Sequence, residues 1–167
     1  GVISQPSMNL LALKGYDFTF KGRTSHAAAS PWAGRNALTA ARKFVDLVDA
    51  RRQGFMTDVR FNAIFPDGGK APNIISERAQ VRTEIRAESI ARVEIEMEGI
   101  VKCARGAALA LDCEVEWSPY MADFADMVRN QPAEDALQKI VADLGFEVSP
   151  TTPASGSSDV GNTSYRC

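Results

Sequence analysis

Apolar and polar residues alternate along four stretches of the chain, and each stretch predicts a β-strand. The first runs over Leu10–Lys21, where Tyr16, Phe18 and Phe20 alternate with Asp17 and Thr19. The same period of two recurs in residues 59–65, 79–86 and 113–117. Strands of this kind form a sheet with one apolar face, which must be covered by another layer.

Two segments between these strands carry apolar residues at helical spacing, over residues 34–51 and 89–109. Ser89 is a suitable N-cap for the second helix, and Arg51 and Gly54 suit the end of the first. The order strand, helix, strand, strand, helix, strand is that of the ferredoxin-like fold. We therefore predict an α+β domain, βαββαβ, in which both helices cover one face of a four-stranded antiparallel sheet.

The pattern changes after about residue 120. An irregular stretch leads to Pro132, which suits the first turn of an extra C-terminal helix that ends at Gly145. Phe146–Val148 predicts a short strand, and the remaining loop is rich in Ser, Thr, Pro and Gly. These elements do not belong to the four-stranded unit, so we expect one domain over residues 8–120 and a fragment of a second over 121–167.

Composition narrows the class of protein. A hydrophobic fraction of 45% and a charged fraction of 24% are ordinary for a globular chain. The net charge of -2 supplies no basic field for nucleic acid, and no apolar run approaches the ~20 residues of a membrane span. The three cysteines are spaced neither as a redox pair nor as a zinc ribbon, which is typical of free thiols in a reducing cytoplasm.

Taken singly, the candidate chemical residues indicate little. His26 is the single histidine, whereas a catalytic zinc site takes about three protein ligands. Ser25 and Ser30 lie in the same loop as His26, so a hydrolytic triad is not expected. Gly68-Gly69 lacks the context of a phosphate-binding loop.

Together, four segments resemble the motifs of one family. Residues 20–37 contain a Gly-x-x-Ser-His-Ala run followed by Pro, Gly and Asn-Ala, and residues 68–75 read Gly-Gly-Lys-Ala-Pro-Asn-Ile-Ile. Residues 83–86 read Thr-Glu-Ile-Arg, and residues 156–162 read Gly-Ser-Ser-Asp-Val-Gly-Asn. In this order they resemble the dimerisation (lid) domain, and then a catalytic-domain loop, of metallopeptidase family twenty. That family includes aminoacylases, carboxypeptidases and p-aminobenzoyl-glutamate hydrolases.

The resemblance implies a role for individual residues. His26 matches the lid histidine that reaches into the partner's active site and stabilises the oxyanion there. Asn73 matches an asparagine that holds the substrate backbone, and Arg86 matches the arginine that grips the substrate carboxylate, a task suited to a bidentate donor. The residues that match a loop lining the substrate pocket are Gly156, Ser157, Ser158 and Asp159. We expect His26, Asn73 and Arg86 to converge on one rim of the sheet. A scatter of more than about 20 Å across opposite faces would favour a generic ferredoxin-like module, because a substrate-sized pocket cannot span it.

The resemblance also implies zinc in an intact parent enzyme. The family's metal ligands lie in a catalytic domain built from sequence on both sides of the lid, and nothing in this chain matches them. We therefore predict that this chain holds no metal ligands and hydrolyses nothing alone. In the parent it would serve as the dimerisation and substrate-binding lid of a zinc-dependent amidohydrolase. The substrates would be small-molecule amides, namely N-acylated amino acids or dipeptides of the p-aminobenzoyl-glutamate kind.

Two interpretations of the predicted fold remain. In the first, the chain forms a homodimer in which lids pair edge to edge, because an exposed edge strand tends to find a partner. In the second, it is a non-enzymatic ferredoxin-like module that binds a small ligand or a partner protein. An RNA-binding sheet would need exposed aromatic residues and a basic face, and the pattern predicts neither.

Overall fold

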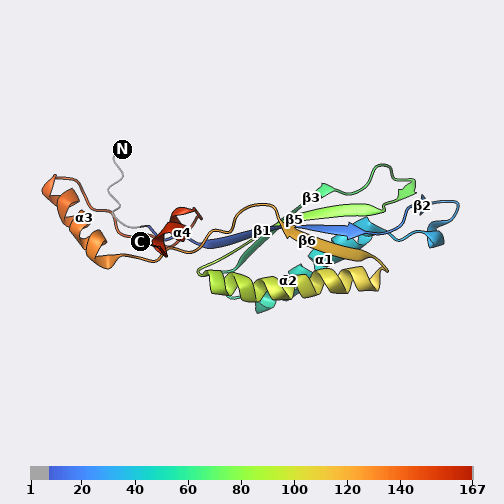
Figure 1. The fold of residues 1–167 in the computed structure, drawn as a ribbon, viewed down its shortest axis with the longest axis horizontal. Helices are drawn as coiled ribbons and strands as arrows, with labels where there is room; N and C mark the ends of the chain where they lie inside the picture. Colours follow the sequence, from blue (N-terminus) through green and yellow to red (C-terminus); the bar gives the residue numbers. More distant parts are fainter. Residues whose placement is uncertain (1–7, 167) are drawn as a thin grey trace.

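The alternating stretches form one four-stranded antiparallel sheet in the structure, a computed structural model that describes residues 8–166 (Figure 1). Its strands lie in the order β3-β5-β1-β6, so β3 and β6 are the edges. Both long helices cover the same face, which confirms the predicted fold class. The elements of this layer are β1 (Ala12–Lys21), α1 (Ala37–Arg51), β3 (Arg60–Asp67), β5 (Arg78–Ala87), α2 (Ile90–Ala110) and β6 (Glu114–Pro119).

The core lies between the sheet and the two helices. Phe18 and Phe20 of β1 and Phe44 of α1 are fully buried, and the ring centroids of Phe18 and Phe44 are 4.7 Å apart. From β5, Val81 and Ile85 enter the same cluster. Burying each such side chain contributes about 1.5–3 kcal/mol, so this cluster is a major source of stability for the layer.

The helix starts are set by side-chain caps. The Ser89 Oγ accepts a hydrogen bond from the Arg92 N–H (3.3 Å), which confirms the predicted N-cap of α2. Helix α1 begins later than the predicted residue 34, because the Asn36 side chain accepts the Thr39 N–H (3.0 Å) and caps it there. The short 3₁₀ turns η1 (Pro31–Ala33) and η2 (Arg52–Gly54) flank α1.

A two-stranded ribbon extends the sheet at one end, which we call the tip. Strand β2 (Ser25–His26) pairs antiparallel with β4 (Ile74–Ile75). The prediction that Ser25 and His26 lie in a loop is therefore wrong, because a strand of two residues is too short to show any alternation. In Figure 1 the ribbon lies at the far end of the molecule from α3 and α4.

The C-terminal part of the chain lies at the opposite end of the sheet, which we call the base. It contains α3 (Gln131–Asp143) and α4 (Val160–Ser164). The backbone of Phe124 exchanges two hydrogen bonds with that of Leu13, at 2.8 and 3.0 Å. These bonds attach the start of the C-terminal part to β1.

In this part of the chain, one predicted element is absent and one element that was not predicted is present. Residues 146–148 form no strand in the structure, since the chain turns at Gly145 (φ +78°) and no neighbouring strand is there to pair with it. The short helix α4 is an addition to the predicted elements, because five residues show no periodicity. Among residues 8–166, no helix is long and apolar enough to cross a membrane.

Candidate functional site

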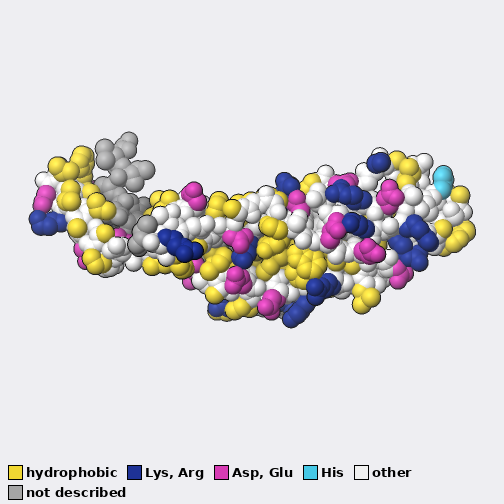
Figure 2. All heavy atoms as spheres, in the orientation of Figure 1, with side chains coloured by type: hydrophobic (Ala, Val, Ile, Leu, Met, Phe, Trp, Pro, Cys, Tyr) yellow, Lys and Arg dark blue, Asp and Glu magenta, His cyan; other side chains and the backbone are white. Residues whose placement is uncertain are grey.

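His26 lies on β2 at the tip, with its imidazole exposed. Its Nδ1 accepts hydrogen bonds from the backbone N–H groups of Ala28 and Ala29, each at 3.2 Å. Because Nδ1 is an acceptor, the neutral ring carries its proton on Nε2. The backbone therefore fixes both the orientation of the ring and its tautomer, and leaves one N–H donor facing outward. Figure 2 shows this single histidine at the end of the molecule.

Asn73 lies beside His26 at the tip. The Ala27 N–H donates to the Asn73 carbonyl oxygen (2.9 Å), directly after the β2–β4 pairing. The Asn73 side chain is exposed. The structure thus brings together two of the three residues that the motifs single out, through main-chain hydrogen bonds alone.

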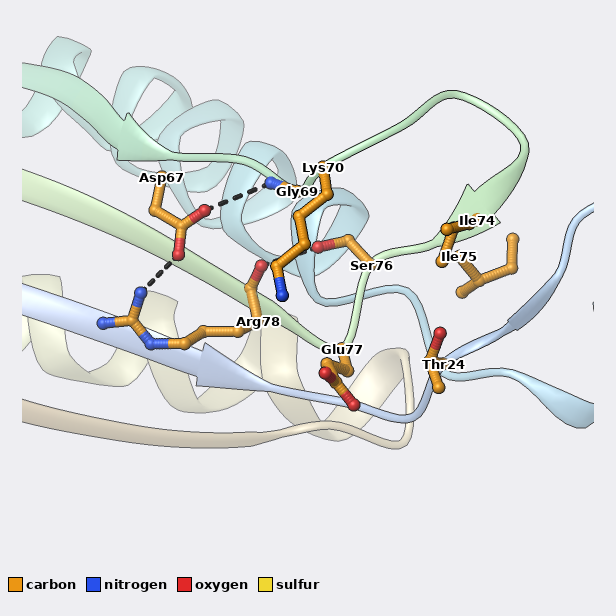
Figure 3. A pocket seen from close by; sticks show the side chains of 9 residues that line it. All are labelled: Thr24, Asp67, Gly69, Lys70, Ile74, Ile75, Ser76, Glu77 and Arg78. Atoms are coloured by element: carbon orange, nitrogen blue, oxygen red, sulfur yellow. Dashed lines mark hydrogen bonds and ion pairs between the residues drawn. The ribbon is translucent and has the colours of Figure 1, made fainter.

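A small cavity of about 150 Å³ lies under the loop that leads to Asn73 (Figure 3). Asp67 pairs with Arg78 and also accepts the Gly69 N–H (3.2 Å). These contacts close the turn after β3 and join it to the start of β5. None of the predicted site residues lines the cavity, whose walls are Thr24, Asp67, Gly69, Lys70, Ile74, Ile75, Ser76, Glu77 and Arg78.

Arg86 lies near the end of β5, at the base, on the sheet face that the helices leave uncovered; we call this the open face. Its guanidinium is half-buried and makes two side-chain contacts. Nη2 donates to Glu84 Oε2 at 3.0 Å, and Nη1 donates to Ser157 Oγ at 3.3 Å. Arg86 is therefore joined to the predicted pocket loop and not to the tip.

The loop of residues 156–159 is bonded to the base at its first residue and is closed by local hydrogen bonds at its other end. The Gly156 carbonyl accepts the Leu11 N–H (2.8 Å) just before β1. The Ser158 Oγ accepts the Val160 N–H (3.3 Å) and lies 3.1 Å from Asp159, which is exposed before α4. Ser157 is the member of this loop whose side chain contacts Arg86.

A larger hollow of about 640 Å³ lies beside Arg86 at the base, between the β3 side of the open face and residues 153–155. Charges of both signs line it. Its walls are Leu11, Thr57, Asp58, Arg60, Asn62, Glu84, Arg86, Glu88, Pro153, Ala154 and Ser155. Its volume lies in the range of ligand pockets, about 300–1,000 Å³.

The prediction that His26, Asn73 and Arg86 converge on one rim is wrong within a single chain. Arg78 begins β5 at the tip, and Arg86 lies near its other end. At about 3.3 Å per residue the strand separates these two positions by about 26 Å, and Asn73 lies beyond Arg78. The structure therefore divides the predicted site into two parts. His26 and Asn73 lie at the tip, and Arg86 and Ser157 lie at the base.

Two residues in the hydrogen-bond network of Arg86, Glu84 and Tyr120, are absent from the site residues that the sequence predicted. Glu84 accepts from Arg86 and also from the Tyr120 hydroxyl (2.8 Å). The Tyr120 hydrogen bond, followed by that from Arg86, lowers the pKa of Glu84. Burial and the bond to Glu84 raise the pKa of Tyr120 to about 12. The spacing Glu-x-Arg on one strand is the signal that could have found Glu84, because residues two apart share a face.

No three His, Cys, Asp or Glu side chains gather as potential metal ligands within residues 8–166. Cys103 of α2 and Cys113 just before β6 are free thiols, and burial raises the pKa of each. The described residues do not fit a zinc site, so the chemistry below uses only the side chains at the tip and the base.

Comparisons with known proteins agree with the motifs. Residues 11–111 match the model of the peptidase dimerisation domain. The chain is 33% identical over 156 residues to a Xaa-Arg dipeptidase of Mus musculus, covering 90% of this chain and 36% of that protein. It is 30% identical over 127 residues to one of the p-aminobenzoyl-glutamate hydrolase subunits, that of Escherichia coli, covering 75% and 26%. The chain thus spans about a third or less of the curated relatives that it matches.

The fold has a near match among solved structures. An aminobenzoyl-glutamate utilization protein from Klebsiella pneumoniae superimposes with a TM-score of 0.82 at 24% identity, covering 99% of this chain and 44% of that one. A hydantoinase/carbamoylase family amidase from Burkholderia vietnamiensis superimposes with a TM-score of 0.74 at 16% identity, covering 92% and 37%. The family match over residues 11–111 shows that this chain belongs to the peptidase dimerisation domain family of metallopeptidase family twenty.

Proposed function

We propose that this chain is the dimerisation and substrate-binding lid of a zinc-dependent amidohydrolase. Its substrates would be N-acylated amino acids or dipeptides, with p-aminobenzoyl-glutamate as the representative. The relatives, named as a dipeptidase and as p-aminobenzoyl-glutamate hydrolase subunits, support a hydrolase parent. The observation that carries the proposal is the division of the site into a tip with a free N–H donor and a base with an arginine.

The tip has the chemistry to stabilise an oxyanion. With Nδ1 held by two backbone N–H groups, His26 presents Nε2–H to whatever lies against the tip. A preoriented donor of this kind stabilises the negative charge that develops on the oxygen of a scissile carbonyl. Asn73 places an exposed amide beside it, and we assign this amide to the substrate backbone.

The base has the chemistry to bind a carboxylate. Arg86 uses one N–H for Glu84 and one for Ser157, which leaves further guanidinium N–H groups for a ligand in the adjoining hollow. A planar guanidinium matches the two oxygens of a carboxylate. We therefore assign the free carboxylate of the substrate to Arg86. Of the loop 156–159, Ser157 contacts Arg86, while the wall of the hollow is formed by the preceding residues 153–155.

A twofold dimer brings the two halves together. Membership of a dimerisation-domain family implies self-association. When two identical edge strands pair antiparallel about a twofold axis, the tip of one sheet comes beside the base of the other. In the proposed dimer, His26 and Asn73 therefore act on the partner's substrate, while Arg86 and Ser157 act on the substrate of their own chain.

The two edges of the sheet differ in how well they suit this pairing. Edge β3 exposes Ile64 (61%) and Phe65 (43%), and the base hollow lies on its side of the sheet. Each edge strand carries one proline, Pro66 on β3 and Pro119 on β6, so proline does not distinguish them, but among the described residues β6 exposes no large apolar side chain. We therefore assign the dimer contact to β3.

The metal belongs to the rest of the proposed enzyme, because the described residues offer no ligand set. On this proposal the purified chain alone hydrolyses no N-acyl amino acid. One tightly bound zinc ion per chain, measured by metal analysis, would contradict it.

Mixing two inactive variants of the intact hydrolase tests the division of the site. His26→Ala and Arg86→Ala homodimers should each lose about two to three orders of magnitude in kcat/KM, as when an oxyanion donor or a buried charged contact is removed. Randomly mixed protomers should recover about a quarter of the wild-type activity, since half of the dimers are mixed and each then holds one complete site. If all these residues served one chain's site, mixing would restore nothing.

Edge variants locate the contact in the same assay. Ile64→Lys on β3 should prevent both dimerisation and the recovery of activity, whereas Ser118→Lys, at an exposed position on β6, should leave both unchanged. The reverse result would move the contact to β6. If both His26→Ala and Arg86→Ala retain wild-type turnover, the lid takes no part in catalysis, and a ferredoxin-like module that only binds a partner becomes the better interpretation.

A further inference from the structure

A chain of polar contacts crosses the open face of the sheet and ends on Arg86. The Tyr120 hydroxyl donates to Glu84 Oε1 at 2.8 Å, and Glu84 Oε2 accepts from Arg86 Nη2 at 3.0 Å. Arg86 Nη1 in turn donates to Ser157 at 3.3 Å. Each carboxylate oxygen of Glu84 thus has one partner, one on each side. The position of Arg86 therefore depends on a tyrosine that lies outside the β5 strand.

Tyr120 reaches Glu84 only because it crosses β1 at a glycine. It follows the last residue of β6, and its N–H donates to the Gly15 carbonyl (3.2 Å). Gly15 is directly opposite Glu84 in the register of β1 and β5. A Cβ at position 15 would lie 2.6 Å from Tyr120 Cε1 and 2.8 Å from Cζ, closer than real Cβ contacts. Because Gly15 has no side chain, the Tyr120 ring can lie across β1 at this position and reach Glu84.

A second arginine packs over the Tyr120 ring. The Arg82 guanidinium lies 4.4 Å from the Tyr120 ring centroid. Asp17 of β1 binds Arg82 through two hydrogen bonds, both 2.8 Å. Bidentate pairs are specific in geometry, so Arg82 has little freedom to leave the ring. Tyr120 thus packs closely on Gly15 of β1 and also contacts a cation that is itself held in place.

Glu84 also borders the hollow that would receive the substrate. An unrestrained carboxylate next to Arg86 would compete with the substrate's carboxylate for the guanidinium. Tyr120 occupies Oε1, so Glu84 offers Arg86 a single oxygen instead of a bidentate fork. The remaining N–H groups of Arg86 stay available on the side of the hollow.

We propose that Glu84 and Tyr120 are positioning residues that orient Arg86 for carboxylate recognition, and that Gly15 is required for Tyr120 to do so. This inference rests on the proposed function, because it takes Arg86 as the carboxylate-binding residue. It adds a specificity mechanism in which a residue two strands from β5 sets the preference for substrates with a free carboxylate.

The test compares an N-acyl amino acid with its carboxamide, which lacks the free carboxylate, in the intact hydrolase that carries this lid. Tyr120→Phe, Glu84→Gln and Gly15→Ala should each raise KM for the carboxylate substrate by about 3–10-fold, which corresponds to one net hydrogen bond. The value of kcat should stay within about twofold, as for lost ground-state binding. The KM for the carboxamide should not change. A purely structural defect would shift both substrates together.

Matched variants control for the substitutions themselves. Tyr16→Phe removes a hydroxyl from the helix-covered side of β1, and Glu116→Gln neutralises an open-face carboxylate at the other end of the sheet, paired with Lys21. Both should leave the ratio of the two KM values unchanged. If Gly15→Ala does not fold, Tyr120→Phe still decides the question, because it removes a single oxygen.

Arg86→Ala separates this inference from the proposed function. It should abolish the preference for the carboxylate substrate. If it does, and Tyr120→Phe and Glu84→Gln behave like their controls, the positioning role is overturned while the role of Arg86 stands. If Arg86→Ala keeps the preference, Arg86 does not bind the carboxylate, and both proposals fail.

Discussion

The tip and the base of the sheet hold their candidate residues in different ways. At the tip, main-chain hydrogen bonds fix the candidate residues. His26 Nδ1 accepts hydrogen bonds from two main-chain N–H groups, and the Asn73 carbonyl oxygen accepts one from a third. At the base, side chains hold Arg86, through Glu84 and Ser157. The tip residues are exposed and the base residues are half-buried.

This difference indicates how each end responds to change. A main-chain scaffold tolerates side-chain substitutions but not a displaced backbone, so glycines at close contacts are its sensitive points. A side-chain network responds to the loss of single polar atoms and to pH. This division fits the proposed dimer, in which the tip must extend into the other protomer as a preformed unit and the base can adjust around a ligand.

The largest effect on stability is expected from Gly22→Ala at the tip. A Cβ at Gly22 would lie well under 3.0 Å from the Arg35 carbonyl oxygen, which belongs to a backbone that cannot turn aside. Overpacking of this kind costs about 1–3 kcal/mol of unfolding free energy. Denaturant unfolding of the purified chain measures it, with Gly106→Ala as the control.

Gly106 lies within α2, and a Cβ there meets nothing within 4 Å. Its replacement should be neutral or should stabilise the chain by up to about 1 kcal/mol, because alanine favours a helix. In the intact enzyme, Gly22→Ala should lower turnover but keep the preference for carboxylate substrates, since Arg86 is remote. Loss of that preference would mean that the tip and the base are not independent.

A smaller effect is expected from acidification, and it should appear at the base. The Tyr120 hydrogen bond, and then Arg86, lower the pKa of Glu84 below its usual value of 4.5. The stability that Glu84 contributes is therefore present above about pH 4.5 and is lost as the pH falls through its lower folded pKa. Tyr120→Phe removes the largest cause of the shift. The variant should lose less unfolding free energy than the wild type between about pH 6 and pH 3.

Equal acid sensitivity in the wild type and in Tyr120→Phe would show that the hydroxyl does not stabilise the Glu84 carboxylate. Tyr16→Phe is again the control, and its pH profile should match that of the wild type. The comparison isolates Glu84 because the other carboxylates are common to all three proteins.

Much of the fold could be predicted because its elements are long and amphipathic. Strand β5 alternates buried Val81 and Ile85 with polar Arg82 and Glu84, which a period-two pattern detects directly. The two-residue strands of the tip and the five-residue α4 could not be predicted in this way. They exist because main-chain hydrogen bonds close them, and no periodicity records those bonds.

The site could be predicted as a set of residues but not as an arrangement. The motifs identify His26, Asn73 and Arg86 without saying which end of a strand each occupies. One clue is present, because Asn73 precedes β5 and Arg86 nearly ends it, so the strand itself separates them. The contact of Tyr120 with Glu84 depends on the register of three strands and on the absence of a side chain at Gly15. The hydrophobic pattern of a single strand contains no information about its register with other strands, so it cannot predict this contact.

The length of β1 and β5 fixes the distance between His26 and the base of its own sheet in the proposed dimer. Ten residues in each strand set how far His26 extends beyond its own base and hence where it meets the partner. Inserting two residues into both strands would preserve the alternation and the core, yet would displace the histidine by about 7 Å. Relatives that share this mode of assembly should therefore vary freely in loop length while keeping the length of these two central strands constant.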